Sequence, residues 1–474
     1  MTQKFRESLS LLLIGVLPLH ALLVTVGTKI ALGPGHAPLT ELALWKEFIL
    51  LTVLCLACFE IFKKRSWGRI DLTDTLILFL LGIALVVSYQ LQVPLKQFAF
   101  GLKYDFFPLV AFIVLRRVQW SEWFRVLLIR VILMIGALVA AFGVLTFFVP
   151  QSFFAMLGYS DLHSLYLPGG PLAAFQQIGE SGVRRIQSTM SGPNQLGLWL
   201  LLPWSVGVLE FLATFDQPHR LIRLIFPQNG SGRPRWFYGV YLLLIGTALL
   251  LTFSRSAWIA AAVIALTAVW MQFSVKEAAR HLLRVTGLSV MCLLLVVVLA
   301  PNTLIRLSSS RDHLLKPLHA MKVMQENPLG LGLGAAGPAS NRVSDACVFL
   351  DAGADTAWAA DRPDLCVFAG DVQVQPEEPA CNCPFVTENW YLQIGTELGF
   401  IGMILFMLLT LTILRRLYVP NANTDEPNDI LSPEVFLPFL GISVAAIFLH
   451  SWEGAAVAYS LWLMAAVAFA KREA

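Results

Sequence analysis

Charged residues are scarce in this chain. Only 14% of its 474 residues are Asp, Glu, Lys or Arg, whereas 57% are hydrophobic, and the mean hydropathy is +0.69. A soluble globular protein carries about 25% charged residues, so the composition excludes that class and indicates a polytopic membrane protein. The net charge of +3 is small and comes with no nucleic-acid-binding pattern, so we expect the lipid bilayer, and no nucleic acid, as a partner.

Apolar segments of about 20 residues recur along the chain, and each is long enough to cross about 30 Å of hydrocarbon. Because an unpaired backbone group in lipid costs several kcal/mol, these segments are predicted to be helices. The predicted fold is all-α, with spans 1–9 within residues 1–300, a large loop over 301–388, and spans 10–12 within 389–474. The predicted spans begin near residues 8, 41, 73, 97, 124, 196, 237, 256, 285, 390, 434 and 452.

Lys and Arg are rare in alternate loops. Because basic residues are held on the cytoplasmic side during insertion, the basic loops and both termini are predicted to be cytoplasmic. The basic set comprises positions 4–6, 63–69, 116–117, 220–235, 276–284, 415–416 and 471–472. The loop "LGPGHAPLT" and residues 149–195, 253–256 and 301–388 are predicted to face outward.

Cysteine occurs in two kinds of segment. Cys55, Cys58 and Cys292 lie in apolar spans, whereas Cys347, Cys366, Cys381 and Cys383 cluster in the large loop. The cluster lacks histidine and paired CxxC spacing, which argues against zinc. Four cysteines on the outward side predict two disulfides instead. Cys381 and Cys383 are too close to pair easily with each other, so each is expected to reach back to Cys347 or Cys366.

The large loop has few other regular features. A helix is expected over about 310–326, ended by the Asn-Pro at 327 and 328, and an irregular stretch is expected over 341–388. "GLGAAG" at 332–337 matches a dinucleotide-binding pattern, but no strand precedes it, so no nucleotide site is predicted. A flexible loop is the favoured interpretation, ahead of backbone lying against a glycan or phosphate.

Positive charge on the predicted outward side is unexpected, because Lys and Arg are concentrated in the predicted cytoplasmic loops. Arg184, Arg185, Arg255 in "LTFSRSAW" and Arg311 in "SSSRDHLL" lie near predicted span ends, with Lys103 as a further candidate. Each alone is typical of an arginine that binds lipid headgroups. Together they predict a diphosphate site, because guanidinium groups make two-pronged hydrogen bonds to phosphate oxygens and stabilise charge on a departing diphosphate.

Glu388 lies in "VTENWYLQIGTELGFIGMILF", in the predicted first turn of the tenth span. One interpretation is a carboxylate stabilised by the helix dipole. The other is a general base that faces the arginines. The residues alone favour neither. His313 and His319 are further candidates for the base, and a structural role is the competing interpretation for each.

Four motifs occur in order over residues 180–410: "RRIQSTMSGPNQLG", "TFSRSAW", "RDHLLKPLHAMKVMQENPLGLGLGAAG" and "ENWYLQIGTELGFIG". The ordered set resembles the O-antigen ligase and O-antigen polymerase family. The resemblance implies an inverting glycosyltransferase of the inner membrane that needs no metal and no cofactor. Such an enzyme transfers a glycan from undecaprenyl diphosphate to a sugar hydroxyl of a lipid- or glycan-linked acceptor at the periplasmic face.

By position, Arg184 or Arg185, together with Arg255 and Arg311, match the family's diphosphate-binding arginines. Family ligases usually carry His where this chain has Glu388, so ligase and polymerase both stay open. The loop "LGPGHAPLT" lacks the acidic pair of metal-dependent lipid-linked glycosyltransferases. A transporter or flippase of a lipid-linked saccharide is the alternative function, but the spans carry few charges away from their ends and no internal repeat is found.

Overall fold

The computed structural model describes most of the chain. The described residues are 2–65, 67–160, 170–174, 176–178, 183–214, 235–273, 287, 307–370, 372–418 and 432–470. For residues 176–178 and 307–312 the description covers the backbone and not the side chains.

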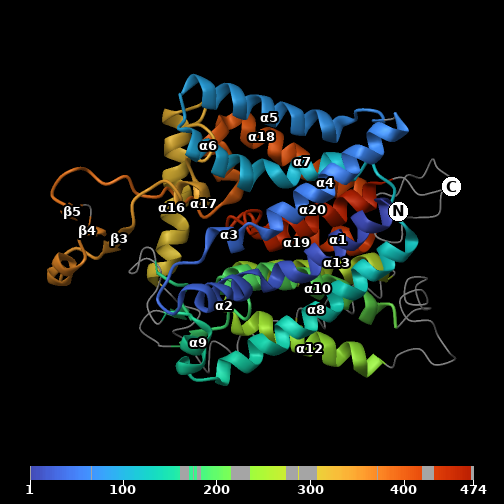
Figure 1. The fold of residues 1–474 in the computed structure, drawn as a ribbon, viewed down its shortest axis with the longest axis horizontal. Coiled ribbons are helices and arrows are strands. Elements are labelled where there is room, and N and C mark those ends of the chain that lie inside the picture. The colour runs from blue at the N-terminus through green and yellow to red at the C-terminus, as the bar shows by residue number, and fades with distance from the viewer. Residues whose placement is uncertain are drawn as a thin grey trace.

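Most of the described helices run side by side in one bundle (Figure 1). Seven segments among the described residues are long and apolar enough to cross a membrane. They are Thr2–Leu32 (α1, η1 and α2), Leu72–Gln90 (α5), Leu95–Leu115 (α6, η2 and α7), Glu122–Phe148 (α8), Pro193–Leu212 (α10), Arg255–Gln272 (α13) and Trp390–Tyr418 (α18). Further apolar helices of the bundle are Trp45–Lys64 (α4), Arg235–Leu251 (α12), Ser432–Ala445 (α19) and Ala455–Phe469 (α20).

The mostly helical class agrees with the prediction from the sequence. Eleven of the predicted span starts lie in, or within three residues of, a described helix, and the one near 285 lies outside the described residues. The number of twelve spans remains a prediction, because seven segments of the described part of the chain have the length and composition of a span.

Helix α10 forms the centre of the bundle and packs against α8, α12, α13 and α19. Fifteen of its 20 residues are buried, as expected for a helix that is apolar all round. Gly197 permits a close approach to α13, because a Cβ atom there would lie 2.9 Å from the Cβ of Ala257. The first turns of α10 and α13 are therefore held next to each other.

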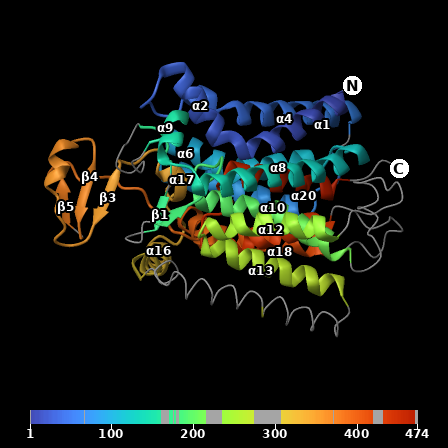
Figure 2. The same cartoon turned by 90° about the horizontal axis from the view of Figure 1, so that it is seen from below.

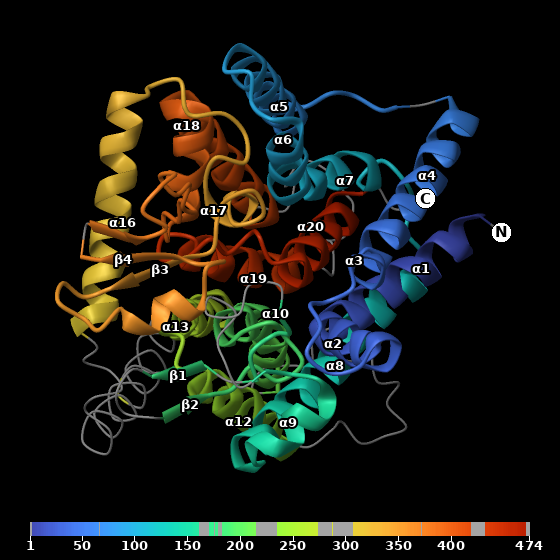
Figure 3. The ribbon, with the colours of Figure 1, turned by 60° about the vertical axis from the view of Figure 1, so that its left-hand side comes forward.

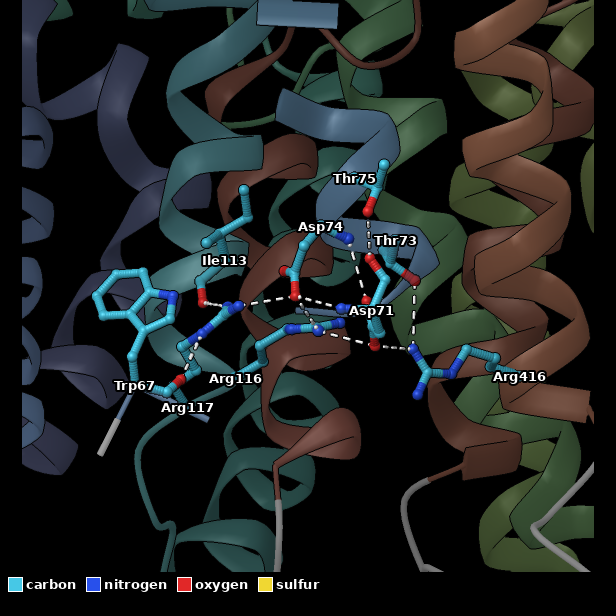
Figure 4. Close-up of polar contacts among 9 residues, drawn as sticks. All are labelled: Trp67, Asp71, Thr73, Asp74, Thr75, Ile113, Arg116, Arg117 and Arg416. Atoms are coloured by element: carbon cyan, nitrogen blue, oxygen red, sulfur yellow. Dashed lines mark hydrogen bonds and ion pairs between the residues drawn. The ribbon is translucent and has the colours of Figure 1, made fainter. Parts of the chain in front are cut away.

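A polar cluster ties helices together at the end of the bundle where α1 begins and α20 ends (Figures 1 and 4). Asp71 and Asp74 form a capping box at the start of α5. Arg116 and Arg117 contact one Asp74 oxygen at 2.8 and 2.7 Å, and Arg416 at the end of α18 contacts Asp71. Arg116 and Arg117, which follow α7, and Arg416, in the last turn of α18, thus lie at one end of the bundle.

The opposite end of the bundle carries residues 307–388. Helix α16 (Leu307–Glu326) packs against α18 and lies across the helix ends (Figures 1 and 3), in agreement with the helix predicted there. The short α17 (Gly337–Ser340) follows it. At the same end, strands β1 (Gln176–Ile178) and β2 (Val183–Arg185) form an antiparallel hairpin, and α9 (Gln151–Leu157) lies near it.

Residues 345–383 form a projection that we call the flap, of which residue 371 is outside the description (Figure 2). The prediction of an irregular stretch was wrong here. Strands β3 (Cys347–Leu350) and β4 (Cys366–Ala369) pair in parallel, and β5 (Val372–Gln375) pairs antiparallel to β4. The structure joins Cys347 to Cys383 and Cys366 to Cys381, so each of the last two cysteines reaches back to an earlier one.

The glycine-rich segment "GLGAAG" is packed rather than loose, so the flexible-loop interpretation was wrong. The amide of Gly332 donates to the Glu397 carbonyl at 3.0 Å, beside a break in α18 where Gly399 has φ +72°. Gly334 has φ +79°, and a Cβ atom there would lie 2.4 Å from the Gln97 carbonyl oxygen. Only glycine combines this backbone conformation with such close packing.

Candidate functional site

The paired arginines on β2 contact different parts of the molecule. Neighbouring side chains on a strand point to opposite faces. The Arg185 guanidinium donates from Nε to the Thr252 carbonyl at 2.9 Å and from Nη2 to the Asn194 side-chain oxygen at 2.7 Å. The Arg184 guanidinium donates to the Val149 carbonyl at 3.0 Å. Arg185 is thereby directed toward the first turn of α10, and Arg184 is directed elsewhere.

Arg255 is the first residue of α13 and follows a tight turn at the end of α12. The Ser254 amide donates to the Thr252 hydroxyl at 3.2 Å, which closes the turn. Phe253 between them has φ +48°, a left-handed conformation that costs a non-glycine residue about 1–3 kcal/mol. This local sequence holds Arg255 at the boundary between two apolar helices.

Arg185 and Arg255 line the same cavity, whose volume is about 260 Å³. The first turns of α10 and α13 open onto it, and helix N-termini present unpaired N–H groups and partial positive charge. The two guanidinium groups and the two helix N-termini make the cavity suited to an anion such as a phosphate. The lining residues are Arg185, Asn194, Phe253, Ser254, Arg255, Ser256, Ile259, His313, Phe448 and Leu449.

Glu388 lies beside this cavity through its contacts with α16. Its Oε1 accepts from the Lys316 ammonium at 2.7 Å, and its Oε2 pairs with Nδ1 of His313, which itself lines the cavity. Its backbone is left-handed, with φ +51°. Glu388 precedes α18 by two residues, and Asn389 caps that helix by accepting from the Leu392 amide at 2.9 Å. The predicted place in the first helical turn was therefore wrong.

The contacts of Glu388 set its ionisation. Burial by itself would raise the pKa of the carboxyl, but hydrogen bonds from His313 and Lys316, together with the positive charges of Lys316 and of His313 in its protonated form, lower the pKa to about 2. An ionised carboxylate only accepts hydrogen bonds, so Nδ1 of His313 carries the hydrogen between them. In the neutral imidazole the other ring nitrogen, Nε2, is then a proton acceptor. A histidine oriented by a carboxylate stands next to a cationic cavity.

The other candidates from the sequence lie away from this cavity or outside the description. His319 packs its ring on Phe385, with 5.3 Å between centroids. Lys103 pairs with Glu47 on α4 at 2.8 Å. The backbone of Arg311 lies in α16, within one turn of His313, but its side chain is outside the part of the chain that the structure describes.

Sequence reasoning did not single out Asn194, Lys316 or His450. Asn194 belongs to "SGPNQLG" and lies only nine residues after Arg185, whose guanidinium it accepts a hydrogen bond from. A smaller cavity of about 40 Å³ shares Asn194 and contains His450 and Glu453. Burial lowers the pKa of His450 to about 4, so this imidazole is neutral at pH 7. Lys316 could have been found, because its spacing from His313 puts both on one face of a helix.

The described residues include one close group of metal-ligand type, formed by Asp345, Cys366 and Cys381. Both sulfurs belong to one disulfide, so neither can bind a metal as a thiolate.

The chain was compared with known protein families and with curated proteins. No family model matches the chain, and no curated protein matches it.

Proposed function

We propose that this protein is a metal-independent, inverting glycan transferase that uses a glycan linked to undecaprenyl diphosphate as its donor. The observation that supports this most directly is one cavity lined by Arg185, Arg255 and His313, with His313 paired to Glu388. Anion-binding groups and an oriented proton acceptor are the two requirements for displacing a diphosphate with a hydroxyl.

The proposed step is a single displacement at the anomeric carbon of the donor. The acceptor hydroxyl oxygen forms a bond to that carbon while the bond from the carbon to the diphosphate oxygen breaks, so the configuration inverts. The electron pair of the broken bond stays on the diphosphate, where Arg185, Arg255 and the helix N-termini stabilise it. The hydroxyl proton moves to Nε2 of His313, and Glu388 stabilises the imidazolium that results.

Glu388 is assigned to the orientation of His313 rather than to direct proton acceptance. A carboxylate whose pKa lies at about 2 is a weak base at neutral pH, since catalytic efficiency is greatest for a pKa near the working pH. Glu388 and His313 thus act as one unit. A ligase and a polymerase would use the same unit, because both pass the glycan to a sugar hydroxyl of a lipid- or glycan-linked acceptor.

In this proposal the protein is a twelve-span protein of the inner membrane, with both termini in the cytoplasm. The basic loops at the end that carries the termini would face the cytoplasm. The cavity, α16 and the flap at the opposite end would face the periplasm, where a donor diphosphate at the headgroup level could reach Arg255. Seven membrane-length segments among the described residues support a membrane protein. The grouping of Arg116, Arg117 and Arg416 at one end supports this orientation.

The test is transfer from a purified lipid-linked donor, with donor binding measured separately. His313→Asn and Glu388→Gln should each lower the transfer rate by about 10²- to 10⁴-fold with little change in donor binding. His319→Asn is the matched control, because His319 lies on the same helix and packs on Phe385. Normal turnover by both His313→Asn and Glu388→Gln would refute the mechanism. Donor translocation without transfer would point to the flippase alternative.

A further inference from the structure

The flap takes no part in the site described above. It projects from the bundle beyond α16 and α17 (Figures 1 and 2). One face of its sheet is buried on a small apolar core that includes Val348, Leu365 and Val367. Side chains alternate along a strand, so Cys347 and Phe349 of β3 lie on the opposite face, as do their register partners on β4.

Phe349 and Phe368 form a stacked pair on this second face. They are direct partners in the parallel register, their ring centroids are 5.0 Å apart, and their planes are 24° apart. Phe349 is 65% exposed, although burying such a ring would contribute about 1.5–3 kcal/mol. Both strands are cross-linked by disulfides that begin two residues before the rings. The pair is therefore a preformed aromatic surface with an uncovered side.

The edge of this surface is also fixed. Gln373 on β5 is the register partner of Phe368. Its side-chain amide donates to the Pro379 carbonyl at 3.1 Å and accepts from the Cys381 amide at 2.9 Å. These bonds hold the proline-containing segment between β5 and Cys381 in place, next to the two rings. A ligand on the pair would meet rings that need no reordering, which lowers the entropic cost of binding.

The charge of the flap indicates which kind of ligand can bind to the two ring faces. Residues 345–383 contain eight acidic residues and one basic residue, Arg362. Anionic lipid headgroups and a second flap would both be repelled by this excess of negative charge. A neutral sugar would not. The face of an aromatic ring is electrically negative, and the C–H groups on one face of a pyranose are apolar and weakly positive, so the two surfaces are complementary.

We propose that Phe349 and Phe368 are a stacking platform for a neutral hexopyranose chain, separate from the catalytic cavity. In taking the glycan that the reaction transfers, this inference rests on the proposed function. The platform holds the chain outside the membrane while one end of it reacts. Stacking uses ring faces and not particular hydroxyl patterns, so neutral chains of different linkage should bind.

The experiment measures binding of maltoheptaose and of chitohexaose to the full-length protein in lipid nanodiscs, by calorimetric titration. Phe349→Ala and Phe349→Leu should each weaken binding about 2- to 12-fold, because leucine keeps apolar bulk without a ring face. Phe349→Trp should retain binding. Val372→Ala is the matched control, since Val372 lies on the same sheet and is 67% exposed. Mass spectrometry of non-reduced protein verifies that both disulfides persist in every variant.

If neither oligosaccharide binds saturably to the wild-type protein, the platform is overturned. The same holds if the wild-type protein, Phe349→Leu and Phe349→Trp all bind the oligosaccharides with equal affinity. Self-association that Phe349→Leu abolishes would assign the rings to a contact between copies and would also overturn it. Transfer assays separate the two proposals. Oligosaccharide binding without any transfer by the wild-type protein refutes only the proposed function, whereas transfer without binding at the flap refutes only the platform.

Discussion

Arg184 and Arg185 are adjacent in the chain, but their guanidinium groups serve different places: Arg185 bonds to Asn194 at the cavity, and Arg184 bonds to the Val149 carbonyl. The alternation of side chains along β2 produces this division. The two adjacent guanidinium groups therefore do not contact a common site in the structure. In our proposal one arginine holds the diphosphate, and the other fastens the hairpin to the segment that follows α8.

Lysine substitutions should separate the arginines. Arg185→Lys and Arg255→Lys should each reduce glycan transfer by about tenfold or more, because an ammonium cannot reproduce the planar, two-pronged contact with a phosphate. Arg184→Lys is the matched control and should keep at least half of the activity. Transfer from purified donor at a fixed donor concentration measures the effect. An Arg184→Lys variant as impaired as Arg185→Lys would remove the distinction.

Much of this architecture follows from local sequence, and the rest depends on packing. The sequence shows the apolar segments, the helix ended by the Asn-Pro at 327 and 328, and the clustering of the cysteines. These features are visible because the spacing of apolar residues, helix capping and composition are local properties. The flap strands were missed because each is only four residues long and the surrounding segment is rich in proline and aspartate, although their Val and Phe residues favour strands.

The site itself could be only partly predicted. The sequence identified Arg185, Arg255, His313 and Glu388 as candidates, but it could not assign partners among residues far apart in the chain. Glu388 lies 72 positions from Lys316, and their contact depends on how α16 crosses α18. The tight packing of "GLGAAG" was equally hidden, because the atoms that exclude a side chain there come from distant helices. They include the Gln97 carbonyl of α6 at Gly334 and the Gln393 side chain of α18 at Gly337.

Reporter fusions should test the orientation. Fusions at positions 66, 228 and 279 are expected to read as cytoplasmic, and fusions at 170 and 350 as periplasmic, because Lys and Arg are concentrated in alternate loops. Paired enzymatic reporters, one active only in the cytoplasm and one only in the periplasm, give a positive signal for either outcome. A cytoplasmic signal at 350 would place the flap and the cavity on the wrong side for a periplasmic reaction.

Both disulfides should be present in protein purified without reductant. The Cys347–Cys383 bridge encloses a separation of 36 residues and the Cys366–Cys381 bridge one of 15, so chain-entropy arguments give about 4 and 3 kcal/mol respectively. Cys347→Ser with Cys383→Ser should therefore speed proteolysis of the flap more than Cys366→Ser with Cys381→Ser. Membrane insertion should be unchanged in both. Free thiols at all four positions, found by mass spectrometry, would contradict the assignment.

The ion pair between Lys316 and Glu388 should make stability depend on pH with a defined sign. The contacts of Glu388 lower the pKa of its carboxyl from 4.5 to about 2, so the stabilisation is fully present above about pH 4.5 and is lost as the pH falls through 2. Lys316→Gln removes one of the groups that lowers the pKa. It should therefore reduce the Tm by about 1–3 °C at pH 7, and the difference from the wild-type protein should shrink as the pH approaches 2.

Lys322→Gln is the control for this prediction, because Lys322 lies on the same helix, is 72% exposed and has its nearest carboxylate, Glu326, at 3.9 Å. Its Tm should differ from that of the wild-type protein by less than about 1 °C at every pH, as expected for an exposed pair. Thermal unfolding in one detergent, from pH 8 to pH 2, measures all three proteins. A Lys316→Gln deficit that stays constant with pH would show that the lysine acts through packing of its aliphatic stem and not through the charge of Glu388. In that event Lys316 would not contribute to the low pKa of Glu388, and the hydrogen bond from His313 would be the remaining contact that favours the ionised carboxylate.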